Sequence, residues 1–97
     1  MNQALNNWLN TMRQDLEANG INATVINGQQ ANSYGINLDS KEFVGGVFYW
    51  PEGRYEVQFN DCGSGEVVLL ETVNFDDPKL LEEYLNQVVF KRLRDKV

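Results

Sequence analysis

Few side chains in this sequence are of the types that catalyse reactions or bind metal ions. The 97 residues include no histidine, which excludes a Ser-His or Cys-His dyad and a His-ligated metal centre within the chain. Cys62 is the single cysteine. It cannot form an internal disulfide, and no basic residue stands beside it to activate the thiol. We therefore expect no nucleophilic role for Cys62.

The remaining candidates for acid–base or phosphate chemistry are also weak. Glu82 and Glu83 are adjacent, and neighbours on a helix point about 100° apart, so they cannot converge on one reacting atom. They fit a solvated helix face, and Asp76-Asp77 fits a helix cap. Gly63-Ser64-Gly65 lacks the lysine and the strand-to-helix setting of a phosphate-binding loop. No calcium-loop pattern occurs. The sequence predicts no catalytic site, no metal and no cofactor.

The charge distribution predicts which kind of partner the protein binds. The formal net charge is −6, with 4 basic and 13 acidic residues in 1–90 and 4 basic and 1 acidic residue in 91–97. An acidic body repels phosphate, so direct nucleic-acid binding is excluded. The basic end fits the negative end of a helix dipole. A basic protein is the expected partner, because complementary charge steers association.

The chain shows no signal for a membrane or for secretion. No apolar run approaches the roughly 18 residues of a membrane span. The first residues, Met1 to Leu5, do not read as a signal peptide. We expect one domain over residues 1–97, located in the cytoplasm.

Hydrophobic spacing predicts a helix at each end of the chain and strands between them. The first helix has an apolar stripe that ends at Gly20, a residue suited to a left-handed cap. The last helix starts at Pro78 with Asp77 as its N-cap. The apolar stripes consist of Leu5, Trp8, Leu9, Met12 and Leu16 in the first helix, and of Leu80, Leu81, Tyr84, Leu85, Val88, Val89 and Leu93 in the last.

Between the helices the period changes to two residues, with strands expected over 21–26, 34–38, 43–50, 54–61 and 66–73. The turns between them are short, with Asn27-Gly28 as the first turn signal. Short connections require antiparallel neighbours. The predicted fold class is therefore α+β: an antiparallel meander sheet of four to five strands, with the N- and C-terminal helices packed on one face. The last strand is apolar on both sides, and its phase stays open.

The loop at 51–53 decides which side chains share a face of the sheet. A three-residue loop pairs Trp50 with Arg54 and Val47 with Val57, which collects the apolar residues on one side. A two-residue loop would instead put Val57 opposite Phe48 and strand apolar surface against charge. We predict the first register, which leaves Phe48, Trp50, Arg54, Glu56 and Gln58 on the face away from the helices.

Large aromatic side chains surrounded by polar groups are typical of a protein-binding patch. The alternative is that Phe48 and Trp50 are covered by the polar segment 29–33 or by a helix on that side. The residues predicted to contact the partner are Phe48, Trp50, Arg54, Glu56, Gln58, Asp61 and Glu66.

The hairpin resembles a family of small bacterial immunity proteins, the TriTu type, found beside contact-dependent growth-inhibition toxins. The matching residues are Gly45, Trp50, Gly53, Asp61 and Ser64-Gly65-Glu66. The opening helix with Trp8 and Leu9 and the closing helix after Asp76-Asp77 are also similar. The sequence departs from the family at Gly46, where a larger polar residue is expected, and at Pro51 in the turn.

The resemblance implies that the protein binds and neutralises a cognate toxin domain. It implies further that this toxin is a tRNA-cleaving nuclease that works with elongation factor Tu, and that all three proteins can share one assembly. Two other classes remain open: a secretion or assembly chaperone, which would bind an unfolded effector segment, and a small enzyme.

Overall fold

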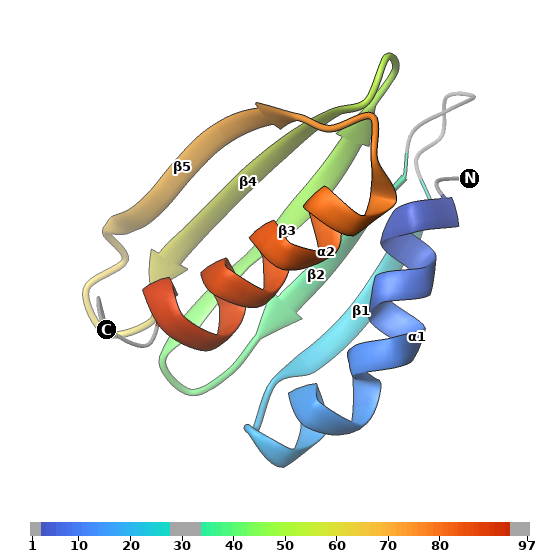
Figure 1. Ribbon diagram of the computed structural model, residues 1–97. Helices are drawn as coiled ribbons and strands as arrows, with labels where there is room; N and C mark the ends of the chain where they lie inside the picture. Colours follow the sequence, from blue (N-terminus) through green and yellow to red (C-terminus); the bar gives the residue numbers. More distant parts are fainter. Residues whose placement is uncertain (1–2, 28–33, 94–97) are drawn as a thin grey trace.

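A five-stranded antiparallel sheet carries one helix from each end of the chain in the computed structural model, which describes residues 3–27 and 34–93 (Figure 1). The strands follow one another across the sheet in chain order, β1-β2-β3-β4-β5. The elements are α1 (Gln3–Ala18), β1 (Asn22–Asn27), β2 (Tyr34–Asp39), β3 (Phe43–Trp50), β4 (Arg54–Asp61), β5 (Val67–Asn74), α2 (Pro78–Gln87) and the π-helix η1 (Val88–Arg92).

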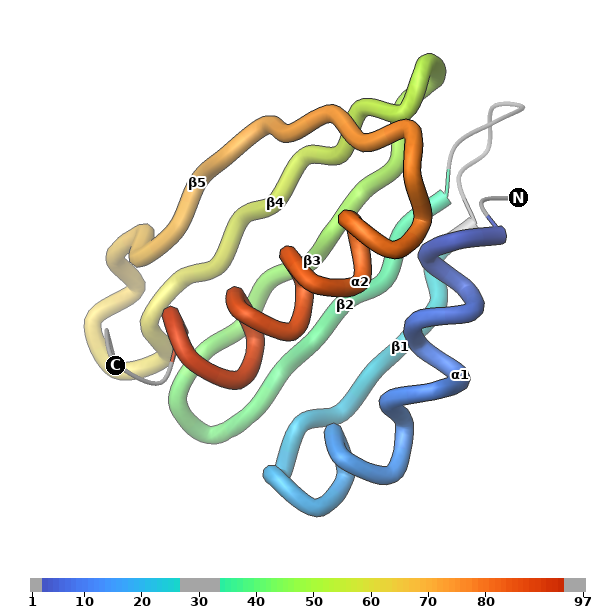
Figure 2. The backbone as a smooth tube through the Cα atoms, in the orientation of Figure 1, coloured from blue at the N-terminus to red at the C-terminus, as the bar shows by residue number. Residues whose placement is uncertain are grey.

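Both helices lie on the same face of the sheet, with α1 beside β1 and α2 across the central strands (Figures 1 and 2). The predicted α+β meander is confirmed, with five strands. The helices meet where the buried Trp8 indole donates its Nε1–H to Asn86 Oδ1 at 2.8 Å. Because this one polar group of the indole is paired, the largest core side chain is buried without an unsatisfied donor.

The central hairpin has the predicted three-residue loop. Trp50 pairs with Arg54, and Val47 pairs with Val57. In the loop, Glu52 and Gly53 have φ values of 70° and 72°, and the Gly53 carbonyl accepts a hydrogen bond from Phe75 N–H at 2.9 Å. The tip of the hairpin is thereby fastened to the segment that leads into α2.

The structure supplies the phase of β5 that the sequence leaves open. Leu69 pairs with the buried Phe59, and Leu70 pairs with Gln58. Leu69 therefore faces the helices, and Leu70 lies on the opposite face with 67 % of its surface exposed. A register shift between Phe59 and Asn60 separates this pairing from that of Val67. Alternation along β5 alone could therefore not have shown which of its side chains face the helices.

The last helix begins as predicted and then changes its winding. Asp77 accepts from Lys79 N–H at 2.9 Å as the N-cap, whereas Leu80 is exposed and does not join the apolar stripe. In an α-helix, residue 92 would follow Leu85 on the buried face. The π-helix η1 adds one residue to the turn, so Leu93 is buried in that place and Arg92 is turned aside.

Arg92, turned aside in this way, holds the helix to the edge strand β5. Its guanidinium pairs with both carboxylate oxygens of Glu71, at 2.9 and 3.2 Å, and Tyr84 Oη–H donates to Glu71 Oε1 at 2.6 Å. Burial and the hydrogen bond to Glu71 raise the pKa of Tyr84 above its usual value. The hydrogen bond from Arg92 to Glu71 raises the pKa of Arg92.

Some sequence predictions lie outside the described residues: the second residue of the Asn27-Gly28 turn, the polar segment 29–33, and the basic residues Arg94 and Lys96. Among the helices that the structure describes, none is long and apolar enough to cross a membrane.

Gly45 provides a test of the central pairing. A Cβ at this position would lie 2.0 Å from Gln58 O and 2.7 Å from Phe59 Cα, both backbone atoms. We expect Gly45→Ala to lower the free energy of unfolding by about 2 kcal/mol or more, because β3 and β4 must separate locally. Urea unfolding followed by circular dichroism measures the change. Gly63→Ala is the control, since a Cβ there would meet only Asp61 Oδ2 at 3.7 Å; an equal loss in both variants would contradict the prediction.

The raised pKa of Tyr84 predicts that the folded protein loses stability in alkali. This pKa is raised in the folded state, whereas the unfolded chain releases the phenolic proton near pH 10. The contribution of protonated Tyr84 to the free energy of unfolding is therefore fully present below about pH 10, and it is lost as the pH rises further. We expect the free energy of unfolding to fall more steeply between about pH 10 and 11.5 in the native protein than in Tyr84→Phe. Urea titrations at a series of pH values make the comparison, and parallel curves would show that Tyr84 is not responsible.

Candidate protein-binding face of the sheet

The sheet face that carries no helix combines aromatic, polar and small residues. Strand pairing places its side chains in successive rows across the strands. The row nearest the hairpin tip holds Trp50, Arg54 and Asn74; the next holds Ile26, Gly35, Phe48, Glu56 and Thr72; a third holds Thr24, Asn37, Gly46, Gln58 and Leu70. We call this surface the open face. In the part of the chain that the structure describes, no helix covers it (Figure 2).

Trp50 is exposed at the end of β3. The residue is 39 % exposed, so the described part of the chain does not bury it. Arg54 stands directly across on β4, with its Cζ 5.7 Å from the centre of the indole ring. This cation–π contact holds a large apolar surface in one position at the hairpin tip.

The ring of Phe48 lies close to the backbone of β2 and β3, because each strand has a glycine next to it. A Cβ at Gly35 would be 2.5 Å from Phe48 Cδ1, and a Cβ at Gly46 would be 3.1 Å from Phe48 Cζ. Phe48 is half-buried as a result. It separates two hollows of about 320 and 260 Å³. The first is lined by Ile26, Tyr34, Gly35, Phe48, Tyr49, Trp50 and Glu56, and the second by Asn37, Val44, Gly45, Gly46, Phe48, Gln58 and Asn60.

Glu56 and Gln58 alternate along β4 beside the aromatic residues, and both are exposed. Glu56 pairs with Phe48 and Gln58 with Gly46, so their polar groups border the two hollows. The structure thus brings together five of the seven residues that the sequence analysis proposed for binding: Phe48, Trp50, Arg54, Glu56 and Gln58.

Asp61 and Glu66 lie apart from these five, near the other end of β4. Seven residue steps along a strand separate Asp61 from Arg54, a distance of roughly 23 Å. Asp61 accepts from Ser64 Oγ–H at 2.8 Å and Ser64 N–H at 3.1 Å, and these hydrogen bonds lower the pKa of its carboxyl group. Asp61 therefore stabilises the 62–66 turn, and the exposed Glu66 follows in that same turn.

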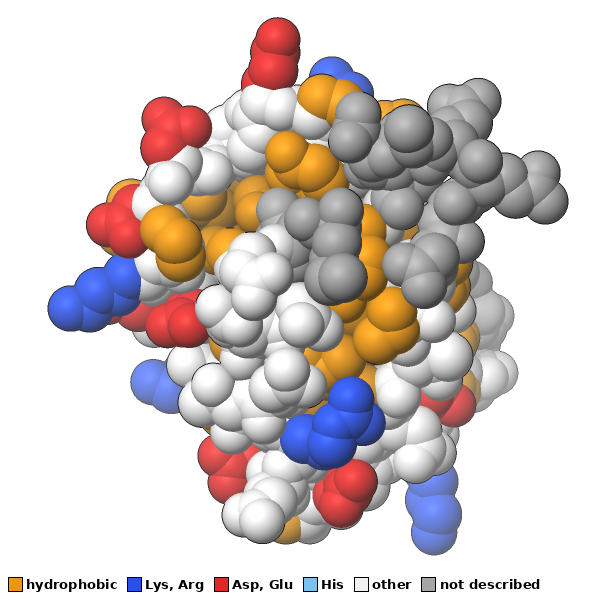
Figure 3. All heavy atoms as spheres, turned by 90° about the vertical axis from the view of Figure 1, so that its right-hand side faces the viewer, with side chains coloured by type: hydrophobic (Ala, Val, Ile, Leu, Met, Phe, Trp, Pro, Cys, Tyr) orange, Lys and Arg blue, Asp and Glu red, His pale blue; other side chains and the backbone are white. Residues whose placement is uncertain are grey.

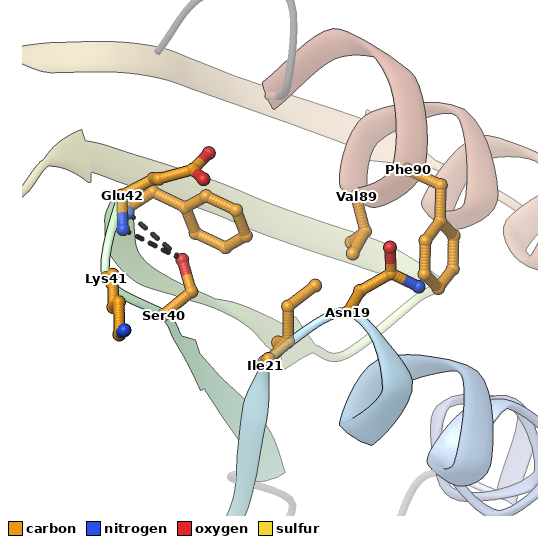
Figure 4. A pocket seen from close by; sticks show the side chains of 9 residues that line it. Asn19, Ile21, Ser40, Lys41, Glu42, Val89 and Phe90 are labelled. Atoms are coloured by element: carbon orange, nitrogen blue, oxygen red, sulfur yellow. Dashed lines mark hydrogen bonds between the residues drawn. The ribbon is translucent and has the colours of Figure 1, made fainter.

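Other hollows lie away from the open face. One of about 540 Å³ opens between the hairpin tip and the start of α2. Another, of about 260 Å³, lies between the end of α1, the 40–43 turn and η1 (Figure 4). There Ser40 Oγ accepts from the backbone N–H groups of Glu42 and Phe43, which serves the turn. No group of three or more potential metal ligands occurs among the described residues.

The side of the molecule formed by α1 and β1 also shows apolar surface. Hydrophobic side chains gather in its middle and acidic side chains lie around its margin (Figure 3). Val25 of β1 is 40 % exposed. This side lacks the exposed indole of the open face.

The sequence matches the immunity protein TriTu family over residues 3–91. This match spans every helix and strand from α1 into η1. The chain belongs to the TriTu family of immunity proteins. A comparison with curated proteins finds no match.

Membership in the TriTu family implies that the protein binds a cognate toxin. The residues that carried the resemblance in the sequence have structural roles in part: Gly45 permits the contact between β3 and β4, and Gly53 has a positive φ in the hairpin loop. Trp50 is the exposed member of that set with a large apolar side chain. It is therefore the residue on which the binding proposal depends most.

Residues of the open face that the sequence analysis did not propose for binding include Ile26, Gly35 and Leu70. Gly35 gave a usable signal, because it alternates with the buried Tyr34 and Ile36. Leu70 gave none, since residues 67–70 are all apolar and the phase of β5 depends on pairing with β4.

The exposure of Trp50 can be measured by fluorescence, because the other tryptophan, Trp8, is buried. Trp8 is 1 % exposed and Trp50 is 39 % exposed, so acrylamide quenching of native fluorescence comes mainly from Trp50. We expect Trp50→Phe to reduce the quenching constant several-fold, because only the buried indole remains. Trp8→Phe, which leaves the exposed indole, is the matched variant and is expected to keep strong quenching. Unchanged quenching in Trp50→Phe would mean that position 50 is covered in solution.

Proposed function

We propose that this TriTu-family protein binds and neutralises a contact-dependent growth-inhibition toxin through the open face. The proposed toxin is a basic, tRNA-cleaving nuclease, and its neutralisation takes place in the cytoplasm. The observation that carries the proposal is the exposed Trp50 beside Phe48 on a sheet face that the helices leave uncovered. The remaining proposed contacts are Arg54, Glu56 and Gln58, with Asp61 and Glu66 as contacts of a partner that extends along β4.

The chemistry of the open face suits a protein partner. Buried aromatic anchors supply much of the energy of protein interfaces, and surrounding polar groups exclude water from them. Arg54 holds the ring of Trp50, and the ring of Phe48 packs against Gly35 and Gly46. Both aromatic rings are therefore positioned before binding. Less conformational entropy is lost on association as a result.

Charge supports a nuclease as the partner. A protein that cleaves RNA needs a basic surface to hold phosphates, and this chain carries a net charge of −6. Complementary charge accelerates encounter and selects against acidic proteins. Occupying the basic surface of the toxin would exclude RNA without any reaction by the immunity protein itself.

Elongation factor Tu enters the proposal through the family resemblance of the hairpin. We infer an assembly in which the toxin contacts both the elongation factor and this immunity protein. The helix-covered side of the sheet stays free when the open face is occupied, so one toxin-bound molecule has surface left for another protein.

Growth rescue tests the function directly. The toxin domain encoded beside this chain is expressed under an inducible promoter, with and without the immunity protein. We expect growth and intact tRNA only when the immunity protein is present, together with a complex of the two folded proteins in size-exclusion chromatography. Binding only to a denatured toxin segment would instead indicate a chaperone.

Trp50 is expected to be the main anchor in that complex. We expect Trp50→Ala to weaken toxin binding by about 2 kcal/mol or more, equivalent to roughly thirtyfold in Kd, as measured by calorimetry. Leu80→Ala is the matched control, because Leu80 is an exposed apolar residue on α2 and is expected to leave the affinity unchanged. Equal effects of the two substitutions would place the interface elsewhere.

A further inference from the structure

The larger hollow of the open face has apolar walls and one charged group. Its volume is about 320 Å³. Ile26 and Phe48 come from two strands that flank Gly35, and Trp50 contributes from the hairpin tip. Gly35 lets the Phe48 ring lie close to the backbone of β2 and form one wall, since a Cβ there would lie 2.5 Å from Phe48 Cδ1. We call this hollow, with Glu56 at its border, the Glu56 socket.

Glu56 is the only ionisable residue other than tyrosine among the described residues that line the socket. Its side chain is exposed, and among described residues it forms no ion pair, in contrast to Glu71, which is held by Arg92. Arg54, on the same strand, does not line the hollow and is placed over the Trp50 ring instead. Within residues 3–27 and 34–93 no cation pairs with the Glu56 carboxylate, so it can pair with a group that enters the socket from outside.

We propose that the Glu56 socket receives a long cationic side chain, arginine or lysine, of the partner toxin. Its methylene groups pack against Ile26 and Phe48, and its charged end pairs with the Glu56 carboxylate. Side chains of this kind commonly bury their stems against apolar surface and keep the charge at a polar border. This inference rests on the proposed function for the identity of the partner, and on the net charge of −6 for the sign of its surface.

Other occupants fit the socket less well. An apolar side chain would pack against the apolar walls, but it would desolvate the Glu56 carboxylate without offering it a hydrogen-bond partner. Such desolvation is costly. An acidic side chain would be repelled. A cationic side chain satisfies both the apolar walls and the carboxylate.

A small-molecule titration tests the socket without the toxin. The full chain, labelled with ¹⁵N, is titrated with N-acetyl-arginine amide and separately with N-acetyl-citrulline amide, its neutral analogue. We expect the arginine compound to shift the Trp50 indole N–H and the Gly35 amide signals, and the citrulline compound to leave them in place. The shifts should disappear in Glu56→Gln and remain in Glu83→Gln, which removes an equal charge from the exposed face of α2. Equal shifts with both compounds, or shifts that persist in Glu56→Gln, would overturn the proposal.

The same pair of variants tests the socket in the complex. We expect Glu56→Gln to weaken binding of the cognate toxin domain about tenfold or more, and Glu83→Gln to change it less than about twofold. The loss of toxin affinity that Glu56→Gln causes should be smaller when the toxin carries methionine in place of the arginine or lysine that contacts Glu56. Full toxin affinity in Glu56→Gln would reject the socket and leave the proposed function intact. A native chain that fails to bind toxin would reject the proposed function, and the arginine titration would still decide the socket.

Discussion

The packing of both helices against one face of the sheet is the constraint on which the other features depend. The inward positions of β2, β3 and β4 carry apolar side chains such as Ile36, Val47 and Val57, all fully buried. Burial of such surface supplies the main driving force for folding. Trp8 joins α1 to α2 above this surface through Asn86. An antiparallel sheet can bury one face and expose the other, so the face opposite the two helices needs no helix of its own.

The open face combines exposure with fixed geometry. Phe48 lies against backbone at Gly35 and Gly46, and Trp50 lies beside Arg54. Neither aromatic ring needs a helix to hold it. Both rings are therefore positioned before any partner arrives, which suits the proposed role of this face in binding a toxin. The absence of side chains at the two glycines is as important to the shape of this face as the aromatic residues are.

The edge strand β5 is held by charged and polar groups that the core does not supply. Glu71 receives hydrogen bonds from Tyr84 and Arg92, and the π-helical turn places Arg92 there while keeping Leu93 buried. A regular α-helix would direct residue 92 toward the core, where an unpaired guanidinium is costly. One extra residue in the turn thus satisfies both the apolar and the charged requirement.

The sequence by itself determined the order of elements, the meander and the register of the central hairpin. These depend on local signals: helical spacing around Trp8, alternation around Val57, the loop at 51–53 and the cap at Asp77. Tertiary structure decided the phase of β5, the change of winding at η1 and the hollow beside Phe48. Each of these depends on residues from different elements, such as Glu71 with Arg92 or Gly35 with Phe48. Pairing between distant residues leaves no periodic signal along the chain, and it is defined only when the sheet and helices are assembled.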